Sequence, residues 1–312
     1  MILLDAKSVA RALPRKELVA ALAKAFTLDV TVPLRAHHEI PVANGNSGIL
    51  LLMPSWSERH IGVKIVSVFP DNAKTGIPAV AGSYLLMDAT TGVPVAMLDG
   101  TELTLQRTAA ASALASTYLS RENSSRLLMV GTGNLAPHLI ESHAAVRPIT
   151  EALIWGRRPE AAKALADKIS EKTYKVTVTN DLETAVRSAD IVSCATLSNE
   201  PLILGEWLRA GQHVDLVGAF KPDMAEADVA AIANASVYVD TRAGALSESG
   251  ELVQAIASGA LRAESIKGSL RELASGKIHG RHATDEITLF KSVGTALEDL
   301  AAAELAVDNA TT

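Results

Sequence analysis

The sequence predicts an α/β protein in which a Rossmann-type, doubly wound parallel sheet is joined to a second domain of the α+β class. The first observation is an apolar run, residues 127–130, that breaks into Gly131-Thr132-Gly133-Asn134-Leu135-Ala136. The second is that strand-like and helix-like segments then alternate for about the next hundred residues. The third is a strand-like stretch before this loop, from about residue 31 to residue 99. A length of 312 residues fits two domains.

The first part of the chain predicts a helix followed by a sheet. Residues 8–28 read as a helix that starts at Ser8 or at Pro14, because Leu18, Leu22 and Ala25 share one face at helical spacing. The predicted strands are residues 49–53, which end at Pro54, residues 61–68, and a hairpin of residues 84–87 and 94–98. An antiparallel or mixed sheet follows from this pattern. An alanine-rich helix is then expected from about residue 101 to residue 118.

The second part of the chain predicts parallel strands with helical crossovers, which is the Rossmann pattern. The expected elements are strands at 127–131, 152–156, 175–179, 190–195, 213–217 and 236–240, with helices at 134–146, 159–170 and 181–187. A last apolar segment, from residue 287 to about 307, has helical spacing and is expected to return to the first domain. We therefore expect one domain of residues 1–120 with 287–312, and a dinucleotide-binding domain of residues 121–286.

The loop after the first Rossmann strand has the residues that a pyrophosphate site needs. Gly131 permits a tight turn, Gly133 lets the backbone approach the phosphates, and Ala136 allows a helix to pack closely on the strand. The helix N-terminus adds free N–H groups and the positive end of its dipole. The predicted cofactor contacts here are Gly131, Thr132, Gly133, Asn134, Leu135 and Ala136. The alternative is an ordinary strand–turn–helix.

Two arginines follow the second Rossmann strand, where sites that prefer NAD place an acidic side chain on the ribose 2′-hydroxyl. Arg157 and Arg158 match a 2′-phosphate in charge and geometry. The sequence therefore favours NADP(H), with NAD(H) possible because arginine also stacks on adenine. The alternative is that one or both arginines are solvated at the start of the next helix.

Composition excludes several classes of function. The net charge of −6, with no block of like charge, argues against nucleic acid and against an anionic membrane surface as partners. Cys194 is the single cysteine, and no apolar stretch approaches the roughly 20 residues of a membrane span. The start of the chain lacks the pattern of a signal peptide, so we expect a cytoplasmic protein. The paired histidines at 37–38 and at 279 and 282 have no third ligand, so no metal is expected.

The chain resembles the ornithine cyclodeaminase/mu-crystallin family nearly from end to end. The matching segments are Leu52-Met53-Pro54, Gly62-Val63-Lys64, Leu98-Asp99-Gly100-Thr101, Arg107-Thr108-Ala109-Ala110, the glycine loop, Glu200-Pro201 with Gly205-Glu206-Trp207, Val217-Gly218-Ala219 with Pro222-Asp223-Met224, and Phe290-Lys291-Ser292-Val293-Gly294. Several such blocks in the same order are far more specific than any one of them.

This resemblance implies a homodimer formed through the sheet of the second domain, and a small α-amino or α-imino acid held against a nicotinamide. It implies that Arg35, Lys64 and Arg107 hold the substrate carboxylate, with Lys64 and Arg107 as the catalytic pair. The residues agree, because Lys64 lies within an apolar strand, where an unpaired ammonium is costly and must face an anion or a wet cleft.

Four further cofactor contacts are expected: Thr108, Thr196, Val217 and Ser292, the last three by resemblance alone. The alternatives are helix capping for Thr108 and Ser292, and core packing for Val217.

The chain departs from the cyclodeaminase pattern at two positions. Where those enzymes have an aspartate this chain has Phe220, and where they have a glutamate it has Leu51. Neither side chain can accept a proton or pair with an ammonium. The remaining pattern resembles the ketimine reductase branch, which reduces Δ1-pyrroline-2-carboxylate or Δ1-piperideine-2-carboxylate to L-proline or L-pipecolate with NAD(P)H.

In that reaction Phe220 would line the ring of the substrate, and the proton would come from water or from Lys64. The alternatives are ornithine cyclodeamination, an alanine dehydrogenase-like activity, and a non-catalytic protein that binds NADPH and a small ligand.

Overall fold

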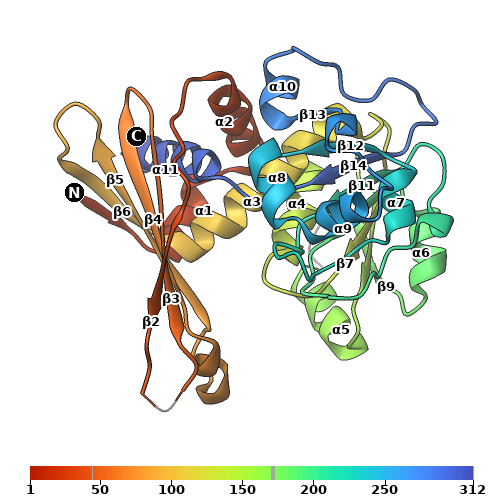
Figure 1. Cartoon of the computed structure of the whole chain (residues 1–312), viewed down its shortest axis with the longest axis horizontal. Coiled ribbons are helices and arrows are strands. Elements are labelled where there is room, and N and C mark those ends of the chain that lie inside the picture. The colour runs from red at the N-terminus through yellow and green to blue at the C-terminus, as the bar shows by residue number, and fades with distance from the viewer. Residues whose placement is uncertain (44, 170–172, 312) are drawn as a thin grey trace. The chain divides into compact units, whose positions relative to one another are not determined.

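Two separate β-sheets, one mixed and one parallel, organise the chain (Figure 1). The structure is a computed structural model that describes residues 1–43, 45–169 and 173–311, with the backbone alone at residues 73 and 74. The chain divides into unit 1, Met1–Thr108 with Thr295–Thr312, and unit 2, Ala109–Gly294. Helix α3, Gly100–Leu119, begins in unit 1 and continues into unit 2.

Unit 1 contains a six-stranded sheet in the order β1-β6-β5-β4-β3-β2. Its strands are β1 Ile2–Leu4, β2 Ala36–Ile40, β3 Gly48–Trp56, β4 His60–Val68, β5 Val80–Asp88 and β6 Pro94–Asp99. Strand β1 pairs in parallel with β6, and the other pairs are antiparallel. Helices α1 Ala6–Ala12 and α11 Ala296–Thr311 pack on strands of this sheet, and α2 Arg15–Thr27 packs on α11.

The structure refines one prediction for unit 1 and corrects another. The helix expected over 8–28 starts at Pro14, the second of its two predicted starts, which caps α2 with a non-helical ψ of 133°, and the residues before it form the separate helix α1. Strand β3 does not end at Pro54 but runs on to Trp56. The N–H of Trp56 donates to the Thr31 carbonyl, on the side away from β4. By the two-residue repeat the missing N–H of Pro54 lies on that same side, beyond the end of β2, so proline costs no ladder bond there.

Unit 2 contains an eight-stranded sheet, entirely parallel, in the order β13-β12-β14-β11-β10-β7-β8-β9. The strands are β7 Arg126–Val130, β8 Glu151–Trp155, β9 Lys175–Val178, β10 Ile191–Cys194, β11 His213–Leu216, β12 Ser236–Val239, β13 Gly268–Ser269 and β14 Thr288–Lys291. The run β9-β8-β7-β10-β11 is the Rossmann order 3-2-1-4-5. The predicted fold class is therefore confirmed, with the order reversing between β7 and β10.

The crossovers of unit 2 are helical or irregular. Its helices are α4 Ala136–Val146, α5 Pro159–Lys168, α6 Leu182–Ser188, α7 Val229–Ala233, α8 Arg242–Glu248, α9 Gly250–Ala257 and α10 Leu270–Ala274. The predicted end of the second of these, residue 170, lies outside the described residues. Two apolar clusters form the core, and neighbouring residues of β7 belong to different clusters, Leu128 to one and Met129 to the other.

The prediction that a helix begins at residue 287 is wrong. Residues Thr288–Lys291 form β14, which pairs with both β11 and β12 and is buried along its whole length. A short apolar run that is buried on both faces has no period that separates a strand from a helix. Helix α11 begins only at Ala296, so residues 288–294 belong to unit 2.

Candidate functional site

The glycine loop between β7 and α4 has the geometry of a pyrophosphate cradle. Gly131 has a φ of +124°, and a Cβ there would lie 2.5 Å from the Ala195 carbonyl oxygen. A Cβ on Gly133 would meet no atom within 4 Å, so open space faces that backbone. Helix α4 has no side-chain hydrogen bond at its cap, Leu135. The N–H of Ala136 donates to the Gly133 carbonyl at 3.0 Å and Pro137 has no N–H. A phosphate would therefore approach this loop through the open space at Gly133, near the positive end of the helix dipole.

The turn after β8 lies against this loop. A Cβ on Gly156 would come within 2.6 Å of Thr132 Cγ2, so the two turns are in contact. Arg157 and Arg158 follow directly and are exposed, with Arg158 as the capping residue of α5. The guanidinium groups are therefore free to meet a ligand on the glycine loop, or water.

Three further predicted contacts lie at the carboxyl ends of neighbouring strands. The backbone N–H of Val217 donates to the Cys194 carbonyl at 2.9 Å, and that of Ser292 donates to the Leu216 carbonyl at 3.2 Å. Thr196, two residues after β10, donates its N–H to the carboxylate of Glu226 at 2.6 Å. Ligands of open parallel sheets bind at this edge, beside the point where the strand order reverses. Thr108, on α3, ends the first of the two segments of unit 1 and is half-buried.

Unit 1 contains a buried cluster of two cations and two carboxylates. Lys64 on β4 is 2% exposed and Arg107 on α3 is 6% exposed. Lys64 Nζ lies 2.7 Å from Asp299 Oδ2. Arg107 donates from Nε to Asp299 Oδ1 at 2.9 Å and from Nη1 to Glu298 Oε2 at 2.7 Å. The predicted catalytic pair is thus joined by one carboxylate, Asp299, at the start of α11.

Burial and neighbouring charges oppose each other in this cluster. Burial lowers the pKa of Lys64 to about 8, with Asp299 acting against that shift and Arg107 adding to it. Burial alone would raise the pKa of Asp299, but Lys64 and Arg107 outweigh it and the pKa is lowered. The pKa of Arg107 is raised, because its two carboxylates outweigh burial. Lys64, with a pKa of about 8, can therefore exchange a proton near neutral pH.

Glu298 and Asp299 were not among the predicted site residues. Both carboxylates are fully buried and face the two cations. Acidic residues in a first helical turn usually stabilise the dipole from the surface. The available signal was their position in an otherwise apolar, alanine-rich helix. The expectation that Lys64 faces an anion is confirmed.

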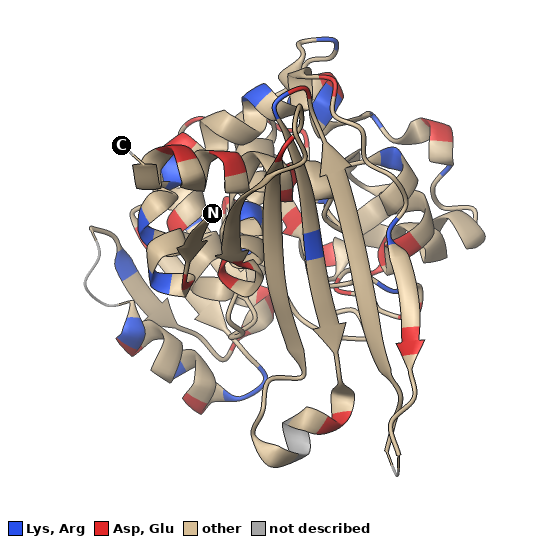
Figure 2. Ribbon diagram, turned by 90° about the vertical axis from the view of Figure 1, so that its left-hand side faces the viewer, with Lys and Arg blue, Asp and Glu red and all other residues tan. Residues whose placement is uncertain are grey.

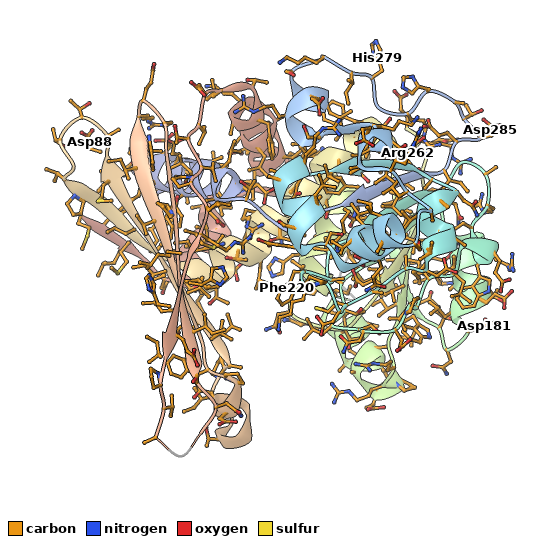
Figure 3. The ribbon with its side chains drawn as sticks, in the orientation of Figure 1. Asp88, Asp181, Phe220, Arg262, His279 and Asp285 are labelled. Atoms are coloured by element: carbon orange, nitrogen blue, oxygen red, sulfur yellow. The ribbon has the colours of Figure 1, made fainter. Side chains whose placement is uncertain are left out.

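The remaining predicted substrate residues are spread over both units. Arg35 precedes β2 and is half-buried. Ala36 pairs with Leu52, so Arg35 lies next in line opposite Met53, which in turn pairs with Lys64. Phe220 belongs to unit 2, in the loop after β11, where it is 46% exposed (Figure 3). The ring lies 5.7 Å from the Lys221 ammonium.

Two classes of feature are not found in the described part of the chain. Residues 1–43, 45–169 and 173–311 hold no group of three or more His, Cys, Asp or Glu side chains placed to bind a metal ion. Over the same residues, no helix combines the length and the apolar character needed to cross a membrane.

Comparison with known proteins identifies the family. The model of the ornithine cyclodeaminase/mu-crystallin family matches residues 2–312. The chain belongs to this family. One of its relatives, Delta(1)-pyrroline-2-carboxylate reductase from Colwellia psychrerythraea, is 39% identical to it over 99% of both chains.

Two solved structures have the same fold. Thermococcus litoralis Delta(1)-pyrroline-2-carboxylate reductase, in complex with NADH and L-proline, has a TM-score of 0.92 and 35% identity, covering 100% of this chain and 98% of that chain. An archaeal alanine dehydrogenase dimer with bound NAD has a TM-score of 0.90 and 30% identity, covering 99% and 95%. The glycine loop and the buried cations therefore lie in a fold that holds nicotinamide dinucleotides in both relatives.

Proposed function

We propose that this protein is a reductase of cyclic α-imino acids that uses a nicotinamide dinucleotide. The substrate is Δ1-pyrroline-2-carboxylate, Δ1-piperideine-2-carboxylate or both, and the product is L-proline or L-pipecolate. The observation that carries the proposal is the match over the whole chain to a reductase whose structure holds NADH and L-proline. The cofactor, when bound, supplies the hydride that reduces the C=N bond.

The residues of unit 2 fit this cofactor. The glycine loop and the N-terminus of α4 would hold the pyrophosphate, since open space faces Gly133 and no side chain caps the helix. Thr196, Val217 and Ser292 would contact the nicotinamide half from the carboxyl ends of the neighbouring strands.

Arg157 and Arg158 support a preference for NADP(H) over NAD(H), because both are exposed beside the glycine loop. We expect the double substitution of alanine for both arginines to weaken NADPH binding roughly 10- to 100-fold and NADH binding much less. Fluorescence titration with both cofactors checks this. Equal losses for the two cofactors would assign the arginines to a part of the ligand other than the 2′-phosphate.

The substrate carboxylate would dock on Arg107, with Lys64 and Arg35 beside it. A guanidinium has three nitrogen atoms that donate, and in the described structure Arg107 directs Nε to Asp299 and Nη1 to Glu298. The two N–H groups of Nη2 and the second N–H of Nη1 remain for the substrate. Fixing the carboxylate orients the C=N carbon for hydride addition, and orientation supplies much of the rate in such a reaction.

We assign the proton of the reaction to Lys64. The substitution Lys64→Arg keeps the charge but not a proton that leaves near pH 8, so kcat should fall roughly 100-fold or more while KM changes less. Lys64→Met should raise KM as well, because it removes the charge. A wild-type kcat in Lys64→Arg would contradict this assignment and would indicate that a water molecule supplies the proton.

Reduction is favoured over deamination because Phe220 and Leu51 cannot hold or deprotonate an ammonium. The deciding experiment is a substrate panel with the purified protein. NADPH and NADH oxidation is measured with pyrroline and piperideine carboxylates and with pyruvate plus ammonium, and ammonia release is measured from ornithine with NAD. We expect turnover with a cyclic imine. Rapid ornithine turnover, or tight NADPH binding without any turnover, would overturn the proposal.

The outer face of the unit 1 sheet supports a homodimer. Leu3, Ile65 and Met97 are 71%, 36% and 39% exposed on strands β1, β4 and β6, and the register pairs Leu3 with Met97. Figure 2 shows few charged residues along the central strands of this sheet. An exposed apolar sheet face of this kind is typical of an interface. Sedimentation of the wild type should give a dimer, and Ile65→Lys with Met97→Lys should give a monomer.

A further inference from the structure

The carboxylate of Glu226 joins two loops at the carboxyl edge of the unit 2 sheet. Its Oε1 accepts from the backbone N–H of Thr196 at 2.6 Å and from the Thr196 hydroxyl at 3.0 Å. Its Oε2 accepts from the backbone N–H of Gly218 at 2.6 Å. Glu226 is fully buried. The two loops are also in backbone contact, since a Cβ on Gly218 would lie 2.0 Å from the Thr196 carbonyl oxygen.

A second layer of charged side chains supports Glu226. Glu251 on α9 accepts the backbone N–H of Glu226 at 3.0 Å through Oε1. Its other oxygen, Oε2, lies 3.3 Å from the Nζ of Lys291 at the end of β14. Glu251 is 2% exposed and Lys291 is fully buried. One chain of contacts therefore crosses the carboxyl ends of β10, β11 and β14.

These ends carry the proposed contacts to the nicotinamide half of the cofactor. Thr196 is held directly, Val217 precedes the held Gly218, and Ser292 follows Lys291. The loop after β10 also touches the glycine loop, because a Cβ on Gly131 would lie 2.5 Å from the Ala195 carbonyl oxygen. The buried carboxylate of Glu226 therefore acts through the backbone of these loops and not on the ligand itself.

We propose that Glu226 is a positioning residue that holds the loops after β10 and β11 in the arrangement that binds the nicotinamide half of the cofactor. This inference rests on the proposed cofactor site in unit 2. It extends that site by a residue that has no contact with the ligand.

The charge state of Glu226 matters because the groups that face its oxygens are donors. A carboxylate accepts all three bonds, whereas a protonated carboxyl would turn its own O–H toward an N–H. Burial raises the pKa of Glu226 to about 7; Lys291 opposes this rise and Glu251 adds to it. The Cys194 thiol on β10 also faces Glu226, and burial raises its pKa well above the usual value, so it stays neutral. The hydrogen bonds from Glu226 to the loops after β10 and β11 should therefore weaken as the pH falls through about 7.

The test measures the Kd of NADH by fluorescence from about pH 6 to about pH 8.5, without substrate. The wild type should bind more weakly as the pH falls through about 7. Glu226→Gln places an amide donor against an N–H, so at pH 8 its Kd should rise roughly 10- to 100-fold. The Kd of the Glu226→Gln variant should then stay constant over this pH range. Glu286→Gln is the matched control, because that carboxylate accepts the N–H groups of His282 and Ala283 before β14, and its Kd should stay within about twofold.

Two further variants keep the test decisive if Glu226→Gln does not fold. Lys291→Met removes a charge that lowers the pKa of Glu226, so the midpoint of the binding curve should move to higher pH. Glu251→Gln should move it to lower pH. A wild-type Kd that is constant from pH 6 to pH 8 would overturn the inference, as would a Glu226→Gln protein with wild-type binding.

Failure of the inference is distinguishable from failure of the proposed reaction. A protein that binds NADH with this pH dependence but reduces no cyclic imine would support the role of Glu226 and overturn the activity. A protein that reduces a cyclic imine, with NADH binding that is indifferent to pH and to Glu226, would do the reverse.

Discussion

The two units each bury a cluster of charges, and the clusters differ in balance. Unit 1 sets Lys64 and Arg107 against Glu298 and Asp299, so its formal charges cancel. Unit 2 sets one cation, Lys291, beside Glu226, Glu251 and Asp240, all buried.

Desolvation acts on both clusters, but it shifts a different group in each. In unit 1 burial lowers the pKa of a cation, Lys64, to about 8; in unit 2 it raises the pKa of a carboxylate, Glu226, to about 7. In each cluster one group has its pKa moved toward neutral pH, because burial outweighs the opposite charge beside it. One cluster should therefore control the alkaline side of activity and the other the acidic side of cofactor binding.

The largest effect on activity and stability is expected from Arg107→Met, which removes one of the two cations of the unit 1 cluster. It leaves Glu298 and Asp299 buried with less positive charge, and loss of one partner in a buried network costs about 3–5 kcal/mol. We expect kcat/KM to fall roughly a thousandfold or more and the free energy of unfolding to drop. Steady-state kinetics and urea unfolding measure the two changes.

Arg59→Met is the control for that prediction. Arg59 and Asp308 form a bidentate pair with the same helix, α11, but their side chains are 55% and 46% exposed. An exposed pair contributes at most about 1 kcal/mol. Similar losses in the two variants would show that burial is not what makes the Arg107 cluster different.

The second effect is a change of the free energy of unfolding with pH, and it tests the unit 2 cluster around Glu226. The pKa of Glu226 is about 7 in the fold and near the ordinary value of 4.5 in the unfolded chain. Between these values the folded state binds a proton that the unfolded state does not. The contribution of Glu226 to the free energy of unfolding should therefore be full below about pH 4.5 and fall by on the order of 3 kcal/mol by about pH 7. Urea unfolding of wild type and Glu226→Gln over that range measures it, and a decline of the same size in both proteins would contradict it.

The smallest change is expected from Asp299→Asn, which keeps the shape of the side chain in the unit 1 cluster but removes its charge. Asp299 raises the pKa of Lys64 against burial, so its loss should lower that pKa further below about 8. Because the proposed reaction takes its proton from Lys64, the alkaline limb of the kcat profile should move to lower pH, and kcat should fall roughly 10-fold at pH 7. The pH profile of kcat checks this. Glu304→Gln, on the same helix and paired with His60, should leave the alkaline limb unchanged.

Much of the fold could be predicted from short patterns. The glycine loop and the alternating segments predicted the parallel sheet because each strand and its crossover helix are set by local periodicity. The candidate residues Lys64 and Arg107 stood out as charges inside apolar segments. Strand β14 was mistaken for a helix, because residues that are buried on both sides have no alternation to read.

What the sequence by itself determined is the class of fold, the loop for the pyrophosphate and the presence of cations that need anions. Only the tertiary structure decided which anions those are. Glu298 and Asp299 lie about 190 residues from Arg107 along the chain, and Glu226 reaches Thr196 and Gly218 across separate strand ends. Pairings of this kind depend on how distant segments pack, and a buried charge has the same letter in the sequence as a solvated one.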